Sequence, residues 1–391
     1  MKYKNANDVL PEELLALIQE YIQGEYIYVP VKDKHVAEIP TEYKMELGMR
    51  DAHIYTKHLE GIGNKRLAQI YNLSESSIRR IILKKHKGYV QMKDNLTQIL
   101  NHWDLQSSDV KQIYNTTWLV DDAYVLKVYQ NFNMLERNLK ILQILDNMNI
   151  PVGKIVHTKD NEPYVLSNDM FYFLSKKLPG SNLVRIGNDS KMAAIMGEII
   201  ADLHIAFIKC EEENIFWNNS LLDEMNGWVK SKFETNGWKY ISKEEYEKIV
   251  SQLALVYDNL PVQLIHRDVH FGNFLFADGK FSGYIDFDLS QRNIRIFDLC
   301  YFLLGLLSEE VKLEITDEVW FEFVKKVFVS YGQKLELTEI EKKAVPLVME
   351  CIELLFVSYF ENINDVRCAE DAFRIFNFVK KQENRIWRSI L

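Results

Sequence analysis

The chain has 391 residues, 47% of them hydrophobic and 26% charged, with a net charge of −9. This balance is typical of globular proteins, and the few glycines (16) and prolines (8) exclude a collagen-like or low-complexity chain. The acidic balance argues against a protein that binds nucleic acid over its whole surface, and four dispersed cysteines without a CxxC pair indicate ordinary reduced thiols. The first residues lack the apolar segment of a signal peptide, and no stretch approaches about 18 uncharged apolar residues. We therefore expect a cytoplasmic protein without a membrane partner.

The charge changes sign along the chain. Residues 1–93 carry 15 Lys and Arg against 12 Asp and Glu, a net of +3, whereas the remainder carries a net of −12. Between Asn64 and Lys87, seven cations accompany a single acid, Glu75. Such a change predicts two modules with different partners, and we place their join near residues 88–95. Residues 1–93 are therefore the first predicted domain.

The apolar pattern of this module predicts helices over residues 11–23, 41–59, 65–71 and 76–85, the last two joined by a tight turn. The segment NKRLAQIYNLSESSIRRIILKKHK resembles the helix-turn-helix domains of small transcription regulators, of the Mor-like and resolvase types. Short hydroxyls and cations on a helix in a DNA groove reach base edges and phosphates. The resemblance therefore implies DNA contacts from Ser76, Ser77, Arg79, Arg80 and Lys84. The alternatives are a helical bundle with a solvated basic face and a module that docks onto the rest of the chain.

The remaining residues predict two lobes of different composition. Short β-rich runs over 109–129, a helical pattern over 134–148 and a strand pair over 164–177 predict a small β-rich lobe, residues 94–180. The mainly helical lobe, residues 181–391, contains one exception. There, the apolar runs VQLIH and FSGYIDF enclose a loop rich in His, Asp and Asn. We expect the two runs to pair like a β-hairpin and to bring their polar residues to one face.

This loop carries the strongest chemical pattern in the chain. His266, Asp268 and Asn273 form HxDxxxxN at the end of the first run, and Asp286 lies in the second. Transfer of a phosphoryl group needs a carboxylate that orients the attacking hydroxyl, and oxygen ligands for the Mg²⁺ that bridges the phosphates. Asp268 can accept the hydroxyl proton, while Asn273 and Asp286 can bind the metal. The alternative is a polar loop in which Asp268 and Asn273 only form turn hydrogen bonds.

The segment LIHRDVHFGNFLF, followed by GYIDFDLSQRNIRIFDLCYFLLGLL, resembles the aminoglycoside phosphotransferase/choline kinase family. The resemblance implies an α+β fold: a bilobal protein-kinase-like fold with a small β-rich N-lobe and a mainly helical C-lobe, here preceded by a small all-α helix-turn-helix domain. It also implies one role for each residue of the loop. Asp268 would be catalytic, Asn273 and Asp286 would bind metal, and His266 and Asp298 would support the loop.

The same resemblance implies nucleotide-binding residues in the N-lobe. Lys127 in AYVLKVY is the expected strand lysine that contacts the phosphates. Its partner would be Glu136 on the following helix, where Asn138 is an equally suitable position. The turn over residues 114–118 lacks the glycines that usually cover the phosphates, so Thr116 and Thr117 would donate hydrogen bonds instead.

Together these residues predict a Mg²⁺-dependent O-phosphotransferase that uses ATP or GTP and a small hydroxyl-bearing substrate. Acids of the helical lobe, Glu350 and Glu353 among them, favour a cationic acceptor such as an aminoglycoside or an amino alcohol, although a solvated helix surface is the alternative for most of them. The competing hypothesis is a DNA-binding regulator whose kinase-like part only senses a nucleotide or metabolite. A sensor needs no base at Asp268, so the complete loop favours an enzyme.

Overall fold

The computed structural model describes residues 63–71, 73–105, 109–114, 116–182, 190–213, 216–308 and 316–391, together with Asp51, Ile54, Tyr55 and His58. The chain divides into two units, Met1–Met49 and Arg50–Leu391, and every described residue belongs to the second. The helix predicted over 11–23 and most of the helix predicted over 41–59 lie outside the described residues.

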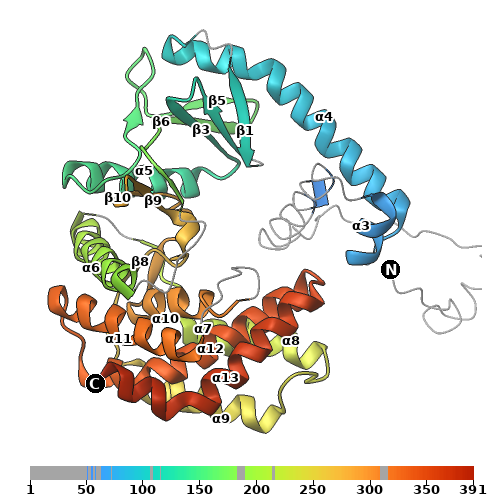
Figure 1. Cartoon of the computed structure of the whole chain (residues 1–391). Coiled ribbons are helices and arrows are strands. Elements are labelled where there is room, and N and C mark those ends of the chain that lie inside the picture. The colour runs from blue at the N-terminus through green and yellow to red at the C-terminus, as the bar shows by residue number, and fades with distance from the viewer. Residues whose placement is uncertain are drawn as a thin grey trace, which may run out of the picture. The chain divides into compact units, whose positions relative to one another are not determined.

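Two helices joined by a short turn begin the described part. Helix α3 spans Asn64–Ile70 and helix α4 spans Glu75–Leu100 (Figure 1). Ser74 caps α4, because its side chain accepts a hydrogen bond from the backbone N–H of Ser77. Buried apolar side chains hold the pair together: Ile54, Leu67, Tyr71, Ile78 and Ile81. The assignment of residues 1–93 to a helix-turn-helix domain stays a prediction, because residues 1–50 lie outside the described part.

Helix α4 is longer than predicted. We expected a helix over 76–85 and a join near 88–95, but the helical backbone continues to Leu100. Leu96, Ile99 and Leu100 are buried against the strands of the β-rich lobe, together with Trp118 and Leu126. The sequence pattern missed this extension because Gly88 and the polar residues after it reduce the apolar periodicity.

The β-rich lobe is a sheet with one long helix. Strand order is β1-β2-β3-β6-β4, and β5 also pairs with β6. Helix α5 spans Phe132–Asn147, close to the predicted 134–148. The six strands lie where β-structure was predicted or just after α5: β1 Val110–Tyr114, β2 Thr117–Val120, β3 Tyr124–Tyr129, β4 Ile155–Val156, β5 Val165–Ser167 and β6 Met170–Lys176.

The rest of the described chain is mainly helical. A large apolar core joins these helices to α5. None of the helices within the described residues has both the length and the apolarity needed to cross a membrane. The helices are α6 Ser190–Glu213, α7 Leu221–Glu224, the π-helical η3 Met225–Val229, α8 Lys230–Thr235, α9 Lys243–Tyr257, α10 Ile296–Gly305, α11 Asp317–Lys334, α12 Glu339–Asn362 and α13 Val366–Ile390.

Five short strands carry the chemically interesting loops, and they pair differently from the prediction. The strands are β7 Ser181–Asn182, β8 Val262–Ile265, β9 Phe274–Ala277, β10 Lys280–Tyr284 and β11 Gln291–Ile294. The runs VQLIH and FSGYIDF do not pair with each other: β8 pairs with β11, and β10 pairs with β9. Strand β9 follows the loop at once and turns back at Asp278-Gly279, where both residues have positive φ. An Asp-Gly dipeptide between apolar runs favours such a hairpin, so the sequence did contain the signal.

Candidate active site

The loop that follows β8 is fixed by a buried carboxylate from α10. Asp298 is fully buried and accepts hydrogen bonds from the backbone N–H groups of His266 (2.8 Å) and Arg267 (2.9 Å). His204 contacts the same carboxylate at 3.0 Å. Arg267 has φ of +72°, a left-handed conformation that costs free energy for a residue other than glycine. These hydrogen bonds offset that cost. They also fix the backbone of the loop just before the next residue, Asp268.

Both carboxylate oxygens of Asp268 have a donor. The Tyr301 hydroxyl donates to Oδ1 at 3.0 Å, and the Asn273 side-chain amide donates to Oδ2 at 2.9 Å. The same amide also donates to the backbone carbonyl of Asp268 at 2.9 Å, so Asn273 closes the loop on itself. The Asp268 side chain nevertheless remains 23% exposed. The carboxylate is therefore both fixed and accessible.

The surroundings of Asp268 keep it ionised. Burial alone would raise its pKa, but the hydrogen bond and charge of His270, the charge of His266 and the Tyr301 hydroxyl outweigh burial and lower the pKa to about 2. His270 Nε2 lies 3.5 Å from Asp268 Oδ2, and its Nδ1 accepts the Gly272 N–H. His266 links the two loops, since its Nε2 lies 3.1 Å from the Ile285 carbonyl. Asp268 is therefore a carboxylate over the whole physiological pH range.

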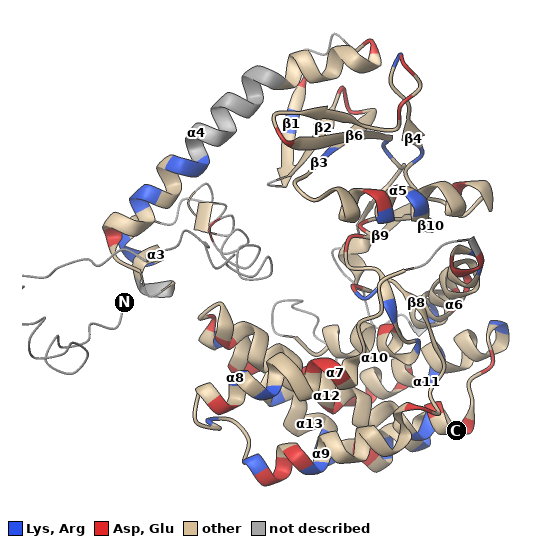
Figure 2. Cartoon of the chain, turned by 180° about the vertical axis from the view of Figure 1, so that it is seen from behind, with Lys and Arg blue, Asp and Glu red and all other residues tan. Residues whose placement is uncertain are grey.

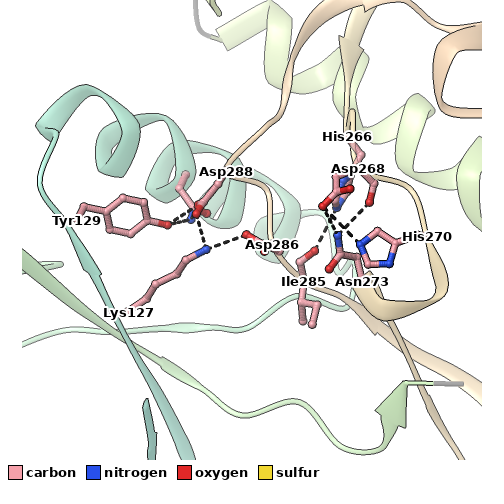
Figure 3. A network of polar contacts seen from close by, with 10 residues as sticks. Lys127, Tyr129, His266, Asp268, His270, Asn273, Ile285, Asp286 and Asp288 are labelled. Atoms are coloured by element: carbon pink, nitrogen blue, oxygen red, sulfur yellow. Dashed lines mark hydrogen bonds and ion pairs between the residues drawn. The ribbon is translucent and has the colours of Figure 1, made fainter. Parts of the chain in front are cut away.

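Asp286 follows β10 and is the more open acid. It has φ of +64°, and its side chain is 48% exposed. In Figure 3 it lies between the Asp268 group and the Lys127 group, and the amide oxygen of Asn273 points away from Asp268. Because the Asn273 amide nitrogen already donates to Asp268, the amide oxygen and the Asp286 carboxylate are left as hard oxygen donors.

These two donors fit a magnesium ion, which binds few protein oxygens and completes its coordination with phosphate and water. Within the described ranges, no three His, Cys, Asp or Glu side chains converge as a metal-binding group. The predicted pair of ligands, Asn273 and Asp286, does not conflict with this finding, because asparagine is not one of those four residue types and the pair contains only one acid. The ligand roles of Asn273 and Asp286 stay a prediction.

Lys127 on β3 reaches the same place from the sheet. Its ammonium lies 2.8 Å from Asp286 Oδ1 and 2.6 Å from Asp288 Oδ2. Burial would lower its pKa, but Asp288, Tyr129 and Asp286 together raise the pKa above its ordinary value. Thr117 is the direct cross-strand neighbour of Lys127, and the carbonyl of Thr116 accepts the Val128 N–H. Thr117 on β2 thus lies beside Lys127 on β3, and Thr116 lies in the turn just before β2.

Glu136 does not reach this group. Its carboxylate pairs with Lys140 one helical turn away, at 3.2 Å. It lines a surface pocket of about 510 Å³ on the other face of α5. The residue of α5 that joins this group is the alternative position, Asn138: it is buried and donates to Asp288, the partner of Lys127, at 3.0 Å. The predicted Lys127–Glu136 ion pair is therefore replaced by ion pairs of Lys127 with Asp286 and Asp288.

No role was assigned from the sequence to three residues of the site, Tyr301, Tyr129 and Asp288. Tyr301 lies three residues after Asp298 on α10, which places both on one helix face toward the loop. That spacing could have identified Tyr301. Tyr129 and Asp288 meet through a hydrogen bond of 2.5 Å across 159 residues, and no local pattern predicts such a contact.

A β-sheet lobe with a lysine on its third strand, followed by a mainly helical lobe whose loops after β8 and β10 carry HxDxxxxN and a second aspartate, is the arrangement of a kinase-like fold. The sequence pattern of the phosphotransferase enzyme family matches residues 110–334, more than half of the chain. The chain therefore belongs to this family.

Solved structures support the same fold. The amicoumacin kinase hAmiN, solved with AMP-PNP, Ca²⁺ and Ami, is 17% identical and has a TM-score of 0.59, over 77% of this chain and 96% of that chain. A microcompartment-associated aminopropanol kinase is 16% identical with a TM-score of 0.54, over 74% and 97%. The GDP complex of aminoglycoside 2'-phosphotransferase-IIIa is 15% identical with a TM-score of 0.52, over 74% and 98%.

Two curated proteins are similar in sequence. A homoserine kinase of Polaromonas naphthalenivorans is 24% identical over 214 residues, which are 48% of this chain and 60% of that protein. The chain thus spans less than two thirds of this relative's length. The uncharacterized protein YraL of Bacillus subtilis is 30% identical over 87 residues, which are 22% of this chain and the whole of YraL. The 87 matched residues of this chain and YraL therefore belong to one protein family.

Proposed function

We propose that this protein is a Mg²⁺-dependent phosphotransferase that moves the γ-phosphate of ATP or GTP to a hydroxyl of a small molecule. The observation that carries the proposal is the state of Asp268. It is an ionised carboxylate held by Tyr301 and Asn273, with an exposed edge, in the loop adjacent to Asp286. A sensor of nucleotides would have no need for a carboxylate fixed in this way.

In the proposed reaction, Asp268 accepts a hydrogen bond from the substrate hydroxyl and orients the oxygen toward the γ-phosphorus. The new O–P bond forms as the bond from the γ-phosphorus to the bridging oxygen breaks, the diphosphate leaves, and the hydroxyl proton passes to Asp268. A carboxylate with a pKa of about 2 is a weak base, so its main contribution is orientation, with the proton accepted late. Mg²⁺, held by Asn273 and Asp286, would neutralise charge on the phosphates.

On the nucleotide side, the Lys127 ammonium would contact the phosphates, assisted by Thr116 and Thr117. The solved relatives were obtained with different nucleotides, AMP-PNP for the amicoumacin kinase and GDP for the aminoglycoside phosphotransferase. Both ATP and GTP are therefore candidates.

For the acceptor we propose a cationic alcohol, such as an amino alcohol or aminoglycoside. Relatives are named for aminopropanol, homoserine and aminoglycosides. Burial and the Asp268 carboxylate raise the pKa of Tyr301. The ionised Asp268 and the half-exposed Asp286 give the loops a negative charge, which suits an ammonium group on the substrate. Glu361 and Glu318 are engaged elsewhere, with Lys239 and Arg385.

The first test needs no knowledge of the acceptor. Binding of ATP and of GTP is measured with and without Mg²⁺, for the wild type and for Asp286→Ala. We expect Mg²⁺ to strengthen binding of one nucleotide in the wild type and to have no such effect in Asp286→Ala. The control is Asp258→Ala, an exposed acid at the end of α9. No binding of either nucleotide to the wild type would refute the proposal.

The second test concerns Asp268. In Asp268→Asn the substituted side chain keeps its size but cannot accept the proton, and we expect turnover to fall by about 10²–10⁴ with nucleotide affinity retained. Amino alcohols and aminoglycosides are screened as acceptors by following release of the nucleoside diphosphate. Full turnover in Asp268→Asn would exclude the proposed role.

A second partner is proposed for the N-terminal segment. Lys65, Arg66, Arg79, Arg80 and Lys84 are all exposed, and Figure 2 shows blue segments on α3 and on the first turns of α4. Ser76 and Ser77 bond to the capping Ser74, and Arg79 also lies 3.7 Å from Glu75. Such a basic helix suits contact with DNA phosphates. Replacing Arg80 and Lys84 by alanine should weaken DNA binding and reduce its salt dependence by about one unit of slope per lost contact. A salt-independent interaction would indicate docking instead.

A further inference from the structure

Asp288 is the point at which the sheet, helix α5 and the loop after β10 meet. Its Oδ2 lies 2.6 Å from the Lys127 ammonium. Its Oδ1 accepts hydrogen bonds from the Tyr129 hydroxyl at 2.5 Å and from the Asn138 amide at 3.0 Å. The Asn138 amide also donates to the Tyr129 hydroxyl, so the three side chains form a closed triangle. Figure 3 shows Tyr129 and Asp288 of this triangle beside Lys127.

We propose that Asp288 is the positioning residue for Lys127: it supplies the carboxylate that holds the ammonium toward the nucleotide phosphates, and Tyr129 and Asn138 hold Asp288 in turn. This inference rests on the proposed function and assigns to a loop the acid that the sequence analysis sought on α5. Lys127 has a long flexible side chain, so an acid that fixes it before the nucleotide arrives reduces the conformational entropy lost on binding.

Asp286 and Asp288 are suited to different tasks. Both oxygens of Asp288 already have protein donors, and its side chain is 24% exposed. Asp286 is 48% exposed and contacts Lys127 through Oδ1. A residue whose lone pairs are directed at fixed donors is a poor metal ligand, whereas the open carboxylate of Asp286 can turn toward a cation. The geometry therefore separates the metal ligand from the residue that orients the lysine.

The neutral side chain of Asn138 follows from the same arrangement. A carboxylate at this position would lie about 3 Å from Asp288, where two like charges repel. An amide donates to Asp288 and adds no charge. Asn138 on α5 thus complements an acid supplied from the loop.

The test compares a nucleoside with its triphosphate in the absence of metal. Affinities for adenosine and ATP, or for guanosine and GTP if the wild type prefers GTP, are measured in EDTA. Their ratio reports the contribution of the phosphates. In Asp288→Asn we expect this ratio to fall about tenfold while nucleoside affinity is unchanged, because only the phosphate contact of Lys127 is disturbed. An unchanged ratio overturns the proposal. A loss seen only with Mg²⁺ also overturns it, because Asp288 would then be a metal ligand.

A double-mutant cycle shows whether Asp288 acts through Lys127. Once Lys127→Met has removed the ammonium, Asp288→Asn should weaken ATP binding no further. An equal loss in both backgrounds would mean that Asp288 acts by another route. A wild type that binds no nucleotide at all would instead contradict the proposed function, so the two failures are distinguishable.

Two further variants exclude a purely structural explanation. The exchange Asn138→Asp with Asp288→Asn keeps one acid and one amide in the same triangle, and we expect it to restore part of the lost phosphate contribution. Tyr129→Phe retains the ring packing and removes one donor, so it should give a smaller loss in the same ratio even if Asp288→Asn folds poorly. Failure of both variants to change the ratio in these directions would contradict the proposal.

Discussion

Two acids in the helical lobe are largely removed from water, yet their pKa values are displaced in opposite directions. Asp268 on the loop after β8 has a pKa of about 2, whereas Glu350 on α12, with 7% of its surface exposed, has a pKa raised to about 7. Burial raises the pKa in both cases. Around Glu350 the charge of Glu383 adds to that effect.

The difference lies in the donors. Hydrogen bonds from His270 and Tyr301 and the electrostatic effect of the His270 and His266 rings converge on Asp268, and they outweigh its burial. For Glu350 the causes of the shift include no donor or cation. The fold therefore keeps Asp268 ionised at neutral pH and leaves Glu350 about half protonated, and this difference arises from the donors around the loop that Asp298 fixes.

The largest effect is expected from Asp298→Ala, which removes the support of the Asp268 loop. Two backbone N–H groups and the His204 ring would lose their acceptor in a fully buried place. We expect the free energy of unfolding to fall by about 3–5 kcal/mol, measured by urea denaturation. The matched control, Asp202→Ala, breaks an exposed ion pair with Lys334 and should cost about 1 kcal/mol or less. Equal losses would show that the loop does not depend on Asp298.

The second prediction concerns pH and the other acid. A folded-state pKa of about 7 lies above the ordinary value of 4.5, so folding favours the protonated form of Glu350. Its contribution to stability is complete below pH 4.5 and is lost as the pH rises through 7. Glu350→Gln should therefore be more stable than the wild type at pH 8, by on the order of 2 kcal/mol, and nearly equal at pH 4.5. Thermal denaturation at both pH values measures this, with the exposed Glu370→Gln as control. A gain independent of pH would contradict the assignment.

The smallest effect is expected from Tyr301→Phe, which removes one donor from Asp268 and keeps the ring beside Phe297 and Phe356. Loss of a hydrogen bond to a charged group should lower kcat about tenfold, with the nucleotide Kd unchanged. The pKa of Asp268 should rise from about 2, moving the acid limb of the kcat/KM profile upward. The control is Tyr164→Phe, in the aromatic cluster of the β-rich lobe. A parallel fall in nucleotide affinity would mean that Tyr301 acts on the fold and not on Asp268.

The same contrast explains which features the sequence could predict. His266, Asp268 and Asn273 lie within eight residues, so their residue types and spacing alone were enough to predict that they form one group. Helix α5 and the strands β1 to β3 were predictable from periodicity over short segments. The partner of Lys127 was not, because the nearest acid on α5, Glu136, turns to Lys140, and the contacting acid comes from a loop about 160 residues further along.

The predicted pairing of β8 with β10 was wrong for a related reason. The apolar runs of β8 and β10 were both identified, but β9 and β11 lie next to them and compete as partners. Strand β11 reads Gln-Arg-Asn-Ile and is mainly polar, so a search for apolar runs did not identify it as a strand. The short turn at Asp278-Gly279 decides the β9–β10 pairing locally, and the burial of Asp298 beneath the loop anchors β8.

Helix α4 joins the basic segment to the β-rich lobe without a linker. At about 1.5 Å per residue, its 26 residues span about 39 Å from the capping Ser74 to Leu100. The boundary that the sequence predicts near residues 88–95 thus lies inside a continuous helix. A shortened enzyme that starts after Leu100 would lack three apolar side chains of the β-rich lobe's core, Leu96, Ile99 and Leu100. Residues of α4 thus belong in part to the fold of the phosphotransferase, and the basic segment and the β-rich lobe share one element of structure.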